Sequence, residues 1–124
     1  MANVYTNYKA VLTTSELTTL YTVGSETTAI IKSIRVSNTD EENNCKVSLY
    51  LVDTSSVSYN LQTNRQVQKG TTEELLAAGS LDQDSADSSI GAPVPLVLKE
   101  SEVLKVQAEN GGDLHVILSV LEIT

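Results

Sequence analysis

The sequence has no tryptophan, no phenylalanine, one histidine and a single cysteine, Cys45. One cysteine cannot form an internal disulfide, and any Ser-His-Asp triad or histidine metal site would have to use His115. The hydrophobic fraction is 40% and the aromatic fraction only 4%. A core must therefore be built from Val, Leu, Ile and the five tyrosines, which suits stacked β-sheets.

Positive charge is scarce as well. Eight Lys and Arg face sixteen Asp and Glu, which gives a net charge of -8 and a pI near 4.4. A nucleic-acid surface needs clustered cations, so we expect no nucleic acid and no anionic membrane among the partners. Neither an apolar signal-peptide core nor a run of about 18 apolar residues occurs. We expect a protein made and kept in a cytosol, or in a particle assembled there.

The length of 124 residues fits one domain, and the apolar pattern predicts an almost purely β fold. Strands are predicted at 17–23, 28–37, 45–53, 57–61, 94–98, 103–108 and 114–123, and residues 4–12 are predicted to form a first strand or a docking arm. In the strand at 28–37, Ile30, Ile34 and Val36 share one face, and Lys32 is a misfit on it. The polar link 110–113 predicts a hairpin between the last two strands. The final strand is apolar on both faces, so it should lie centrally or against a neighbouring subunit.

About seven or eight short strands predict an antiparallel β-sandwich or jelly roll. We expect a single domain over residues 1–124, with an insert at 62–92 that departs from the strand pattern. Within it, 71–79 predicts one short helix, with Thr71 as N-cap, Glu74 completing a capping box and Gly79 ending the helix.

The insert continues into an acidic stretch that contains Asp82, Asp84 and Asp87. Their spacing resembles half of a calcium loop, but the central glycine and the closing glutamate are absent. A solvated acidic loop is the expected state, and no metal or other cofactor is predicted.

Other candidate chemistry has a simpler structural explanation. His115 opens an apolar strand, where we expect a hydrogen-bonded structural histidine, and Cys45 has no metal-ligating neighbours in the sequence. Paired carboxylates could serve glycosidic chemistry only inside a cleft. Here the pairs fall on the predicted helix start and on a turn: Glu73 with Glu74, and Glu100 with Glu102. We predict no catalytic residues and no enzyme.

Two blocks of the sequence resemble small structural proteins of tailed bacteriophages, especially marine and cyanobacterial ones. The first holds residues 17–23 followed by 27–38, and the second holds 95–98, 104–106 and 113–123. The resemblance covers about residues 12–61 and 93–124. It departs at 24–26, where Gly-Ser-Glu replaces a Pro-Ala-Gly type of turn. It implies a virion component of the head surface, or of the neck and tail, without defined catalytic residues.

These observations predict a virion protein that decorates or cements the capsid as a homo-oligomer, with a trimer favoured. Its partners would be the major capsid protein or neck and tail proteins. A neck, tail or fibre component that contacts an adaptor or host receptor is the alternative, and a carbohydrate-binding sandwich ranks third because exposed aromatics are few. The predicted protein contacts are Tyr5, Tyr8, Leu75, Leu76 and Ile90, although the tyrosines could equally fill the core and the two leucines could pack on their own sheet.

Overall fold

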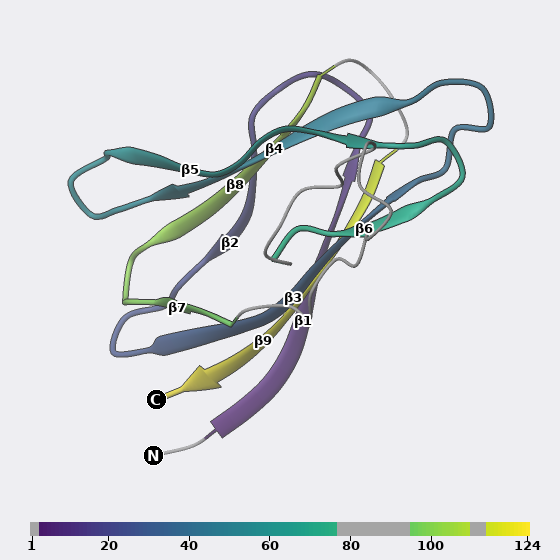
Figure 1. The fold of residues 1–124 in the computed structure, drawn as a ribbon. Helices are drawn as coiled ribbons and strands as arrows, with labels where there is room; N and C mark the ends of the chain where they lie inside the picture. Colours follow the sequence, from purple (N-terminus) through teal and green to yellow (C-terminus); the bar gives the residue numbers. More distant parts are fainter. Residues whose placement is uncertain (1–2, 77–94, 110–113) are drawn as a thin grey trace, which may run out of the picture.

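The computed structural model describes residues 3–76, 95–109 and 114–124, which form nine β-strands in two antiparallel sheets (Figure 1). The first sheet has the order β1 (Asn3–Leu12), β9 (Leu114–Ile123), β3 (Thr28–Asn38), β6 (Thr72–Glu74), and β7 (Leu96–Leu98) also pairs with β3. The second has the order β2 (Thr18–Thr22), β8 (Val103–Ala108), β4 (Cys45–Val52), β5 (Ser58–Val67). The predicted antiparallel sandwich is confirmed.

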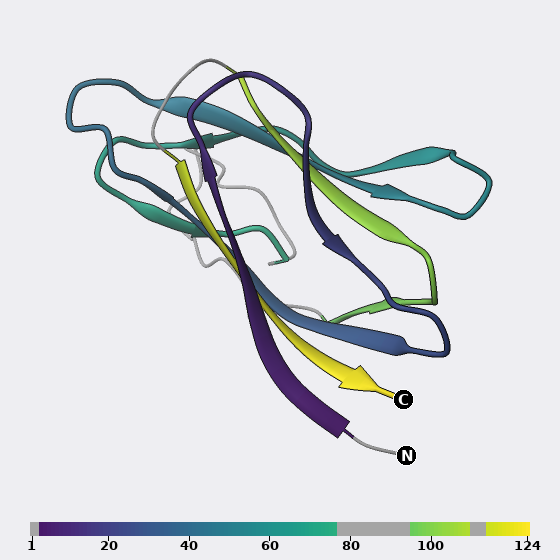
Figure 2. The ribbon, with the colours of Figure 1, turned by 180° about the vertical axis from the view of Figure 1, so that it is seen from behind.

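The strand pairs are nested along the chain. β4 pairs with β5, β3 with β6 and β7, β2 with β8, and β1 with β9. The pairs alternate between the two sheets, which is the order of a jelly roll. Figure 2 shows the chain passing over one end of the sandwich from β1, at the edge of the first sheet, to β2, at the edge of the second.

The predicted hairpin between the last two strands is wrong, because β8 and β9 belong to different sheets. Each of them already has a neighbour on both sides. β8 lies between β2 and β4, and β9 lies between β1 and β3. The link at 110–113 lies outside the described residues.

β9 is a central strand, as its doubly apolar sequence predicts. It pairs with β1 from Leu114 to Ile123 and with β3 along nearly the same length. Its inward side chains Leu114, Val116 and Leu118 are fully buried. They pack in one core with residues of the second sheet that are also fully buried, among them Leu49 and Leu104.

A β-bulge in β3 explains the apparent misfit at Lys32. The register with β9 slips between Ile31 and Ser33, so one extra residue is accommodated and the alternation changes phase there. Ile31 is therefore buried, whereas Ile30 is half-buried on the outer face and Lys32 is exposed. The expectation that Ile30 shares a face with Ile34 and Val36 is wrong for this reason.

The helix predicted at 71–79 is wrong over its first half, where the chain forms strand β6 along the edge of β3 that does not pair with β9. The Glu74 carboxylate accepts hydrogen bonds from the Ile34 backbone N–H at 2.8 Å and from the Ser33 hydroxyl, so it does not form a capping box. The Leu75 N–H donates to the Ile34 carbonyl at 2.8 Å. Pairing with a neighbouring strand satisfies these backbone groups better than a single isolated helical turn could. The second half of the predicted helix lies outside the described residues.

β6 and β7 occupy one edge of β3 between them. β6 lies opposite residues 35–37 of β3 and β7 lies opposite residues 29–31. Together they take the place of one continuous strand beside β3. Of the expected insert at 62–92, residues 62–67 belong to β5 and 72–74 to β6, and residues from 77 onward lie outside the described part.

The two faces of β9 can be compared by substitution at adjacent positions. Leu118→Ala should lower the free energy of unfolding by about 2–5 kcal/mol, because Leu118 is fully buried and its loss leaves a cavity. Ile117→Ala removes a side chain that is 44% exposed on the outer face and should lower it by about 1 kcal/mol or less. Chemical denaturation measures both, and equal losses would contradict the assignment of faces.

Candidate interaction face

A row of apolar side chains crosses the outer face of the first sheet. Tyr5 of β1 lies opposite Leu121 of β9, Leu121 lies opposite Ile30 of β3, and Ile30 lies opposite Val97 of β7. Directly opposed residues in a sheet place their side chains in reach of each other, so the four form one continuous strip. Tyr5 is 74% exposed and Val97 58% exposed, while the two central members are half-buried. We call this strip the outer-face row.

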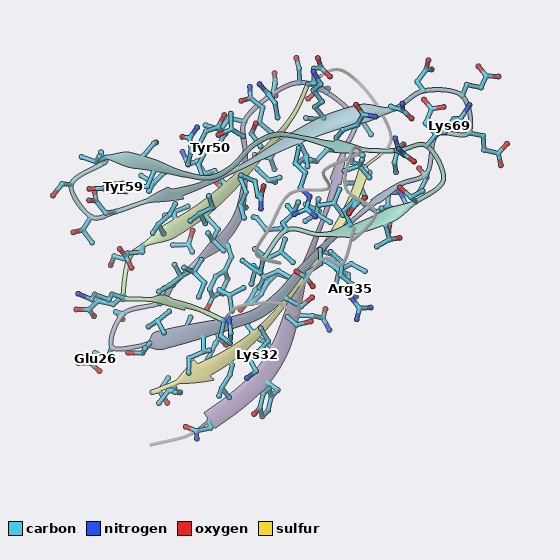
Figure 3. The ribbon with its side chains drawn as sticks, in the orientation of Figure 1. Glu26, Lys32, Arg35, Tyr50, Tyr59 and Lys69 are labelled. Atoms are coloured by element: carbon cyan, nitrogen blue, oxygen red, sulfur yellow. The ribbon has the colours of Figure 1, made fainter. Side chains whose placement is uncertain are left out.

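Basic side chains lie on the same face of the sheet as the outer-face row. Lys9 and Arg35 both oppose Ile117, and Lys32 extends from the β3 bulge. All three cations are exposed, and Figure 3 shows Lys32 and Arg35 projecting away from the second sheet. Glu74, opposite Arg35, is already hydrogen-bonded to β3. A face with apolar and basic character on a chain of net charge -8 is complementary to an acidic surface.

Tyr8 has a different role from Tyr5. The hydroxyls of Tyr21 and Tyr8 both donate to Oε2 of Glu122, at 2.7 and 3.3 Å, and the two rings lie 4.7 Å apart at 44°. Tyr8 is on β1 and Tyr21 on β2, which are edge strands of the two sheets. Tyr8, Tyr21 and Glu122 therefore connect the two sheets at these edges, and we call them the tyrosine clasp. Burial, together with the Glu122 carboxylate, raises the pKa of Tyr21 and, in the same direction, that of Tyr8.

The structure places the predicted contact residues in three kinds of environment. Tyr5 lies in the outer-face row, and Tyr8, 37% exposed, takes part in the clasp. Leu75 is 2% exposed inside the core and Leu76 packs against it, which favours the alternative that they hold their own sheet. Ile90 lies outside the described residues. A role for these residues in binding a partner stays a prediction.

The sequence-based prediction missed most of the outer-face row. Val97 lies in a three-residue strand, too short for a reliable alternation, and Ile30 was assigned to the face of Ile34 and Val36 because the bulge has no sequence signature. One signal was present in the sequence. The outward apolar side chains of β9, Ile117 and Leu121 among them, make that strand hydrophobic on both faces.

The remaining candidates form no catalytic arrangement among the described residues. His115 is exposed and its imidazole makes no hydrogen bond within the described part, in contrast to the expectation of a hydrogen-bonded histidine. Glu100 and Glu102 accept hydrogen bonds from backbone N–H groups, those of Glu26 and Lys99, both at 2.7 Å. Over residues 3–76, 95–109 and 114–124, no group of three or more His, Cys, Asp or Glu side chains is placed to hold a metal ion.

Two further points concern metals and membranes. The aspartates at 82, 84 and 87, considered for calcium, lie outside the described residues. Within the described ranges, the structure contains no helix with the length and apolar character needed to cross a membrane.

Comparisons with known proteins find similarity at the level of structure. No model of a known protein family matches the chain, and no curated protein matches it. A solved structure described as "Structure of infectious bursal disease virus Gt strain" is similar over 98% of this chain, with a TM-score of 0.47 and 11% sequence identity. This chain covers 32% of the chain in that structure. The resemblance to tailed-phage structural proteins stays a prediction.

The tyrosine clasp predicts a specific alkaline response. The folded pKa of Tyr21 lies above its unfolded value, so above about pH 10 the unfolded chain loses a proton that the folded chain keeps. Stability from this group is complete below that pH and is lost as the pH rises. Tyr21→Phe should lower the free energy of unfolding by about 1–2 kcal/mol at pH 7 and should flatten its decline at alkaline pH.

Tyr8→Phe is the matched control, since Tyr8 is more exposed than Tyr21 and the hydrogen bond from Tyr8 to Glu122 is longer. Tyr8→Phe should have a smaller effect on the free energy of unfolding at pH 7 and on its decline at alkaline pH. Urea denaturation at a series of pH values gives the measurement. Parallel stability curves for the wild type and Tyr21→Phe would show that the clasp does not couple folding to the Tyr21 proton.

Proposed function

We propose that this protein is a non-enzymatic structural protein of a tailed-bacteriophage virion, and that it decorates or cements the capsid through the outer face of its first sheet. The observation that carries the proposal is the outer-face row, which presents exposed Tyr5 and Val97 on a rigid sheet. The resemblance of residues 12–61 and 93–124 to phage structural proteins supports the same role. A jelly roll is one of the folds used in viral capsids.

The energetics of docking favour this face. Burying an exposed side chain of this size contributes roughly 1.5–3 kcal/mol, and an aromatic anchor beside aliphatic neighbours is typical of interface hot spots. The side chains extend from paired strands, so little backbone entropy is lost when a partner binds. Lys9, Lys32 and Arg35 would then meet acidic groups of the partner at the rim of the contact, where charge speeds association and selects orientation.

We propose other virion proteins as the partners, with the major capsid protein first, and assembly in the host cytoplasm followed by residence in the virion. We also propose that the chain acts as a homo-oligomer, a trimer by preference. A domain of this size has a stability on the order of 5–15 kcal/mol, and binding of the folded state by neighbouring subunits adds to it.

A location in the neck, tail or a fibre is the second candidate, with an adaptor or a host receptor as the partner. The exposed tip of the β4–β5 hairpin is the observation that favours it. Val57 is 46% exposed and Tyr59 52% exposed, and Figure 3 places Tyr59 at the far end of that hairpin. The copy number on purified particles distinguishes the two locations, since a capsid decoration is present in many copies and a neck or tail component in few.

The docking face is tested with particles stripped of this protein. The double variant Tyr5→Ser with Val97→Ser should bind about 100-fold more weakly in a co-sedimentation assay, because two apolar anchors are lost. Tyr59→Ser is the control, an exposed tyrosine on the other sheet, and it should bind like the wild type if the outer-face row is the docking site.

Thermal melts must show that the double variant remains folded, as expected for exposed positions. Unchanged binding by the double variant would refute docking through the outer-face row. Loss of binding in Tyr59→Ser alone would instead support docking by the hairpin tip.

A further inference from the structure

The outer face of the second sheet carries a hollow of about 390 Å³ with mostly polar walls. It lies on the opposite side of the sandwich from the outer-face row, and Figure 3 shows Tyr50, one of its lining residues, on the second sheet and far from Lys32. Its polar lining comes from β4, β5, β8 and the residues that follow β1 and β8: Ser15, Ser48, Tyr50, Asn64, Gln107 and Glu109. We call it the polar hollow.

A bulge in β5 builds one wall of the polar hollow. The β4–β5 register slips between Val47 and Leu49, so that Thr63 and Asn64 lie opposite Ser48 alone. Asn64 has a φ of 48°, a left-handed conformation that asparagine tolerates better than most residues, and its N–H donates to Ser48 Oγ at 3.0 Å. Ser48 itself is 6% exposed. The fold therefore holds a buried hydroxyl and a left-handed asparagine side by side.

The floor and the rim are also fixed by hydrogen bonds. Gln107 lies directly opposite Ser48 in the β4–β8 register. Its Nε2 donates to the Ser15 carbonyl at 3.0 Å, and its Oε1 accepts from the Tyr50 hydroxyl at 3.5 Å. Glu109, an exposed residue, also lines the hollow, and its carboxylate has no hydrogen-bond partner among the described residues.

We propose that the polar hollow binds a neutral saccharide. Each sugar hydroxyl donates and accepts at once, and the hollow is lined by two amides, three hydroxyls and a carboxylate, which together supply both functions over a small area. The Tyr50 ring provides an apolar surface for the C–H face of a sugar ring. The Glu109 carboxylate disfavours anionic ligands, and the small apolar lining disfavours hydrophobic ones.

The saccharide site goes beyond the proposed virion role and does not require it. Because the polar hollow and the outer-face row lie on opposite outer faces, a copy docked through the row would leave the hollow open to solution. Binding to a sugar and binding to a particle are measured separately, so either can fail alone.

The test is ligand-observed NMR on the whole protein, with the methyl glycosides of glucose, galactose, mannose and N-acetylglucosamine as probes. We expect saturation transfer to at least one of them. Asn64→Gly keeps the left-handed backbone and removes the amide, so it should weaken that binding about tenfold, as for the loss of one good hydrogen bond. Glu109→Ala, at an exposed position that does not endanger folding, should weaken it similarly.

Asn7→Ala is the control, since it removes an exposed amide from the first sheet and should leave the affinity unchanged. Absence of saturation transfer to all four glycosides would overturn the proposal. So would binding that Asn64→Gly and Glu109→Ala both leave as strong as in the wild type.

Discussion

The pairing of β9 on both sides, with β1 and with β3, is the constraint on which the rest of the structure depends. It fixes the register of three strands taken from both ends of the described chain, so the inward residues Val116 and Leu118 meet the second sheet as one layer. The same register fixes the outer face. Tyr5, Leu121 and Ile30 form a straight row because each is opposite the next, and no loop is needed to hold them there.

The edge of β3 opposite β9 shows how the fold accommodates an interrupted neighbouring strand. A strand position that could be filled by one continuous segment is filled by β6 and β7, which are separated by more than twenty residues in the sequence. Between them, both backbone groups of Ile34 are satisfied, since its N–H donates to the Glu74 carboxylate and its carbonyl accepts from the Leu75 N–H. A buried backbone group without a partner would be costly, and a carboxylate replaces the missing strand partner there.

The sequence predicted most strands because alternation is visible wherever one face is buried. It predicted Cys45–Val52 almost to the residue, and it placed the doubly apolar β9 in the centre. It could not predict the bulge at Lys32, which depends on tertiary register, or strand β6, because the local helix signals of 71–79 were overridden by pairing with β3. The tyrosine clasp and the polar hollow were also beyond reach, since their members come from strands that are distant in the sequence.

The nested strand order also separates the chemistry of the two outer faces. The first sheet presents an apolar row with exposed cations, and the second presents a polar hollow edged by a carboxylate, while the chain as a whole is strongly acidic. An acidic partner would attract the first face and repel most of the remaining surface, so long-range electrostatics would orient the molecule before any contact forms. The molecule would then be oriented on its partner without a deep groove in either surface. A flat, rigid face with apolar and basic side chains would be sufficient for such a partner, because the sheet fixes the relative positions of these side chains before contact.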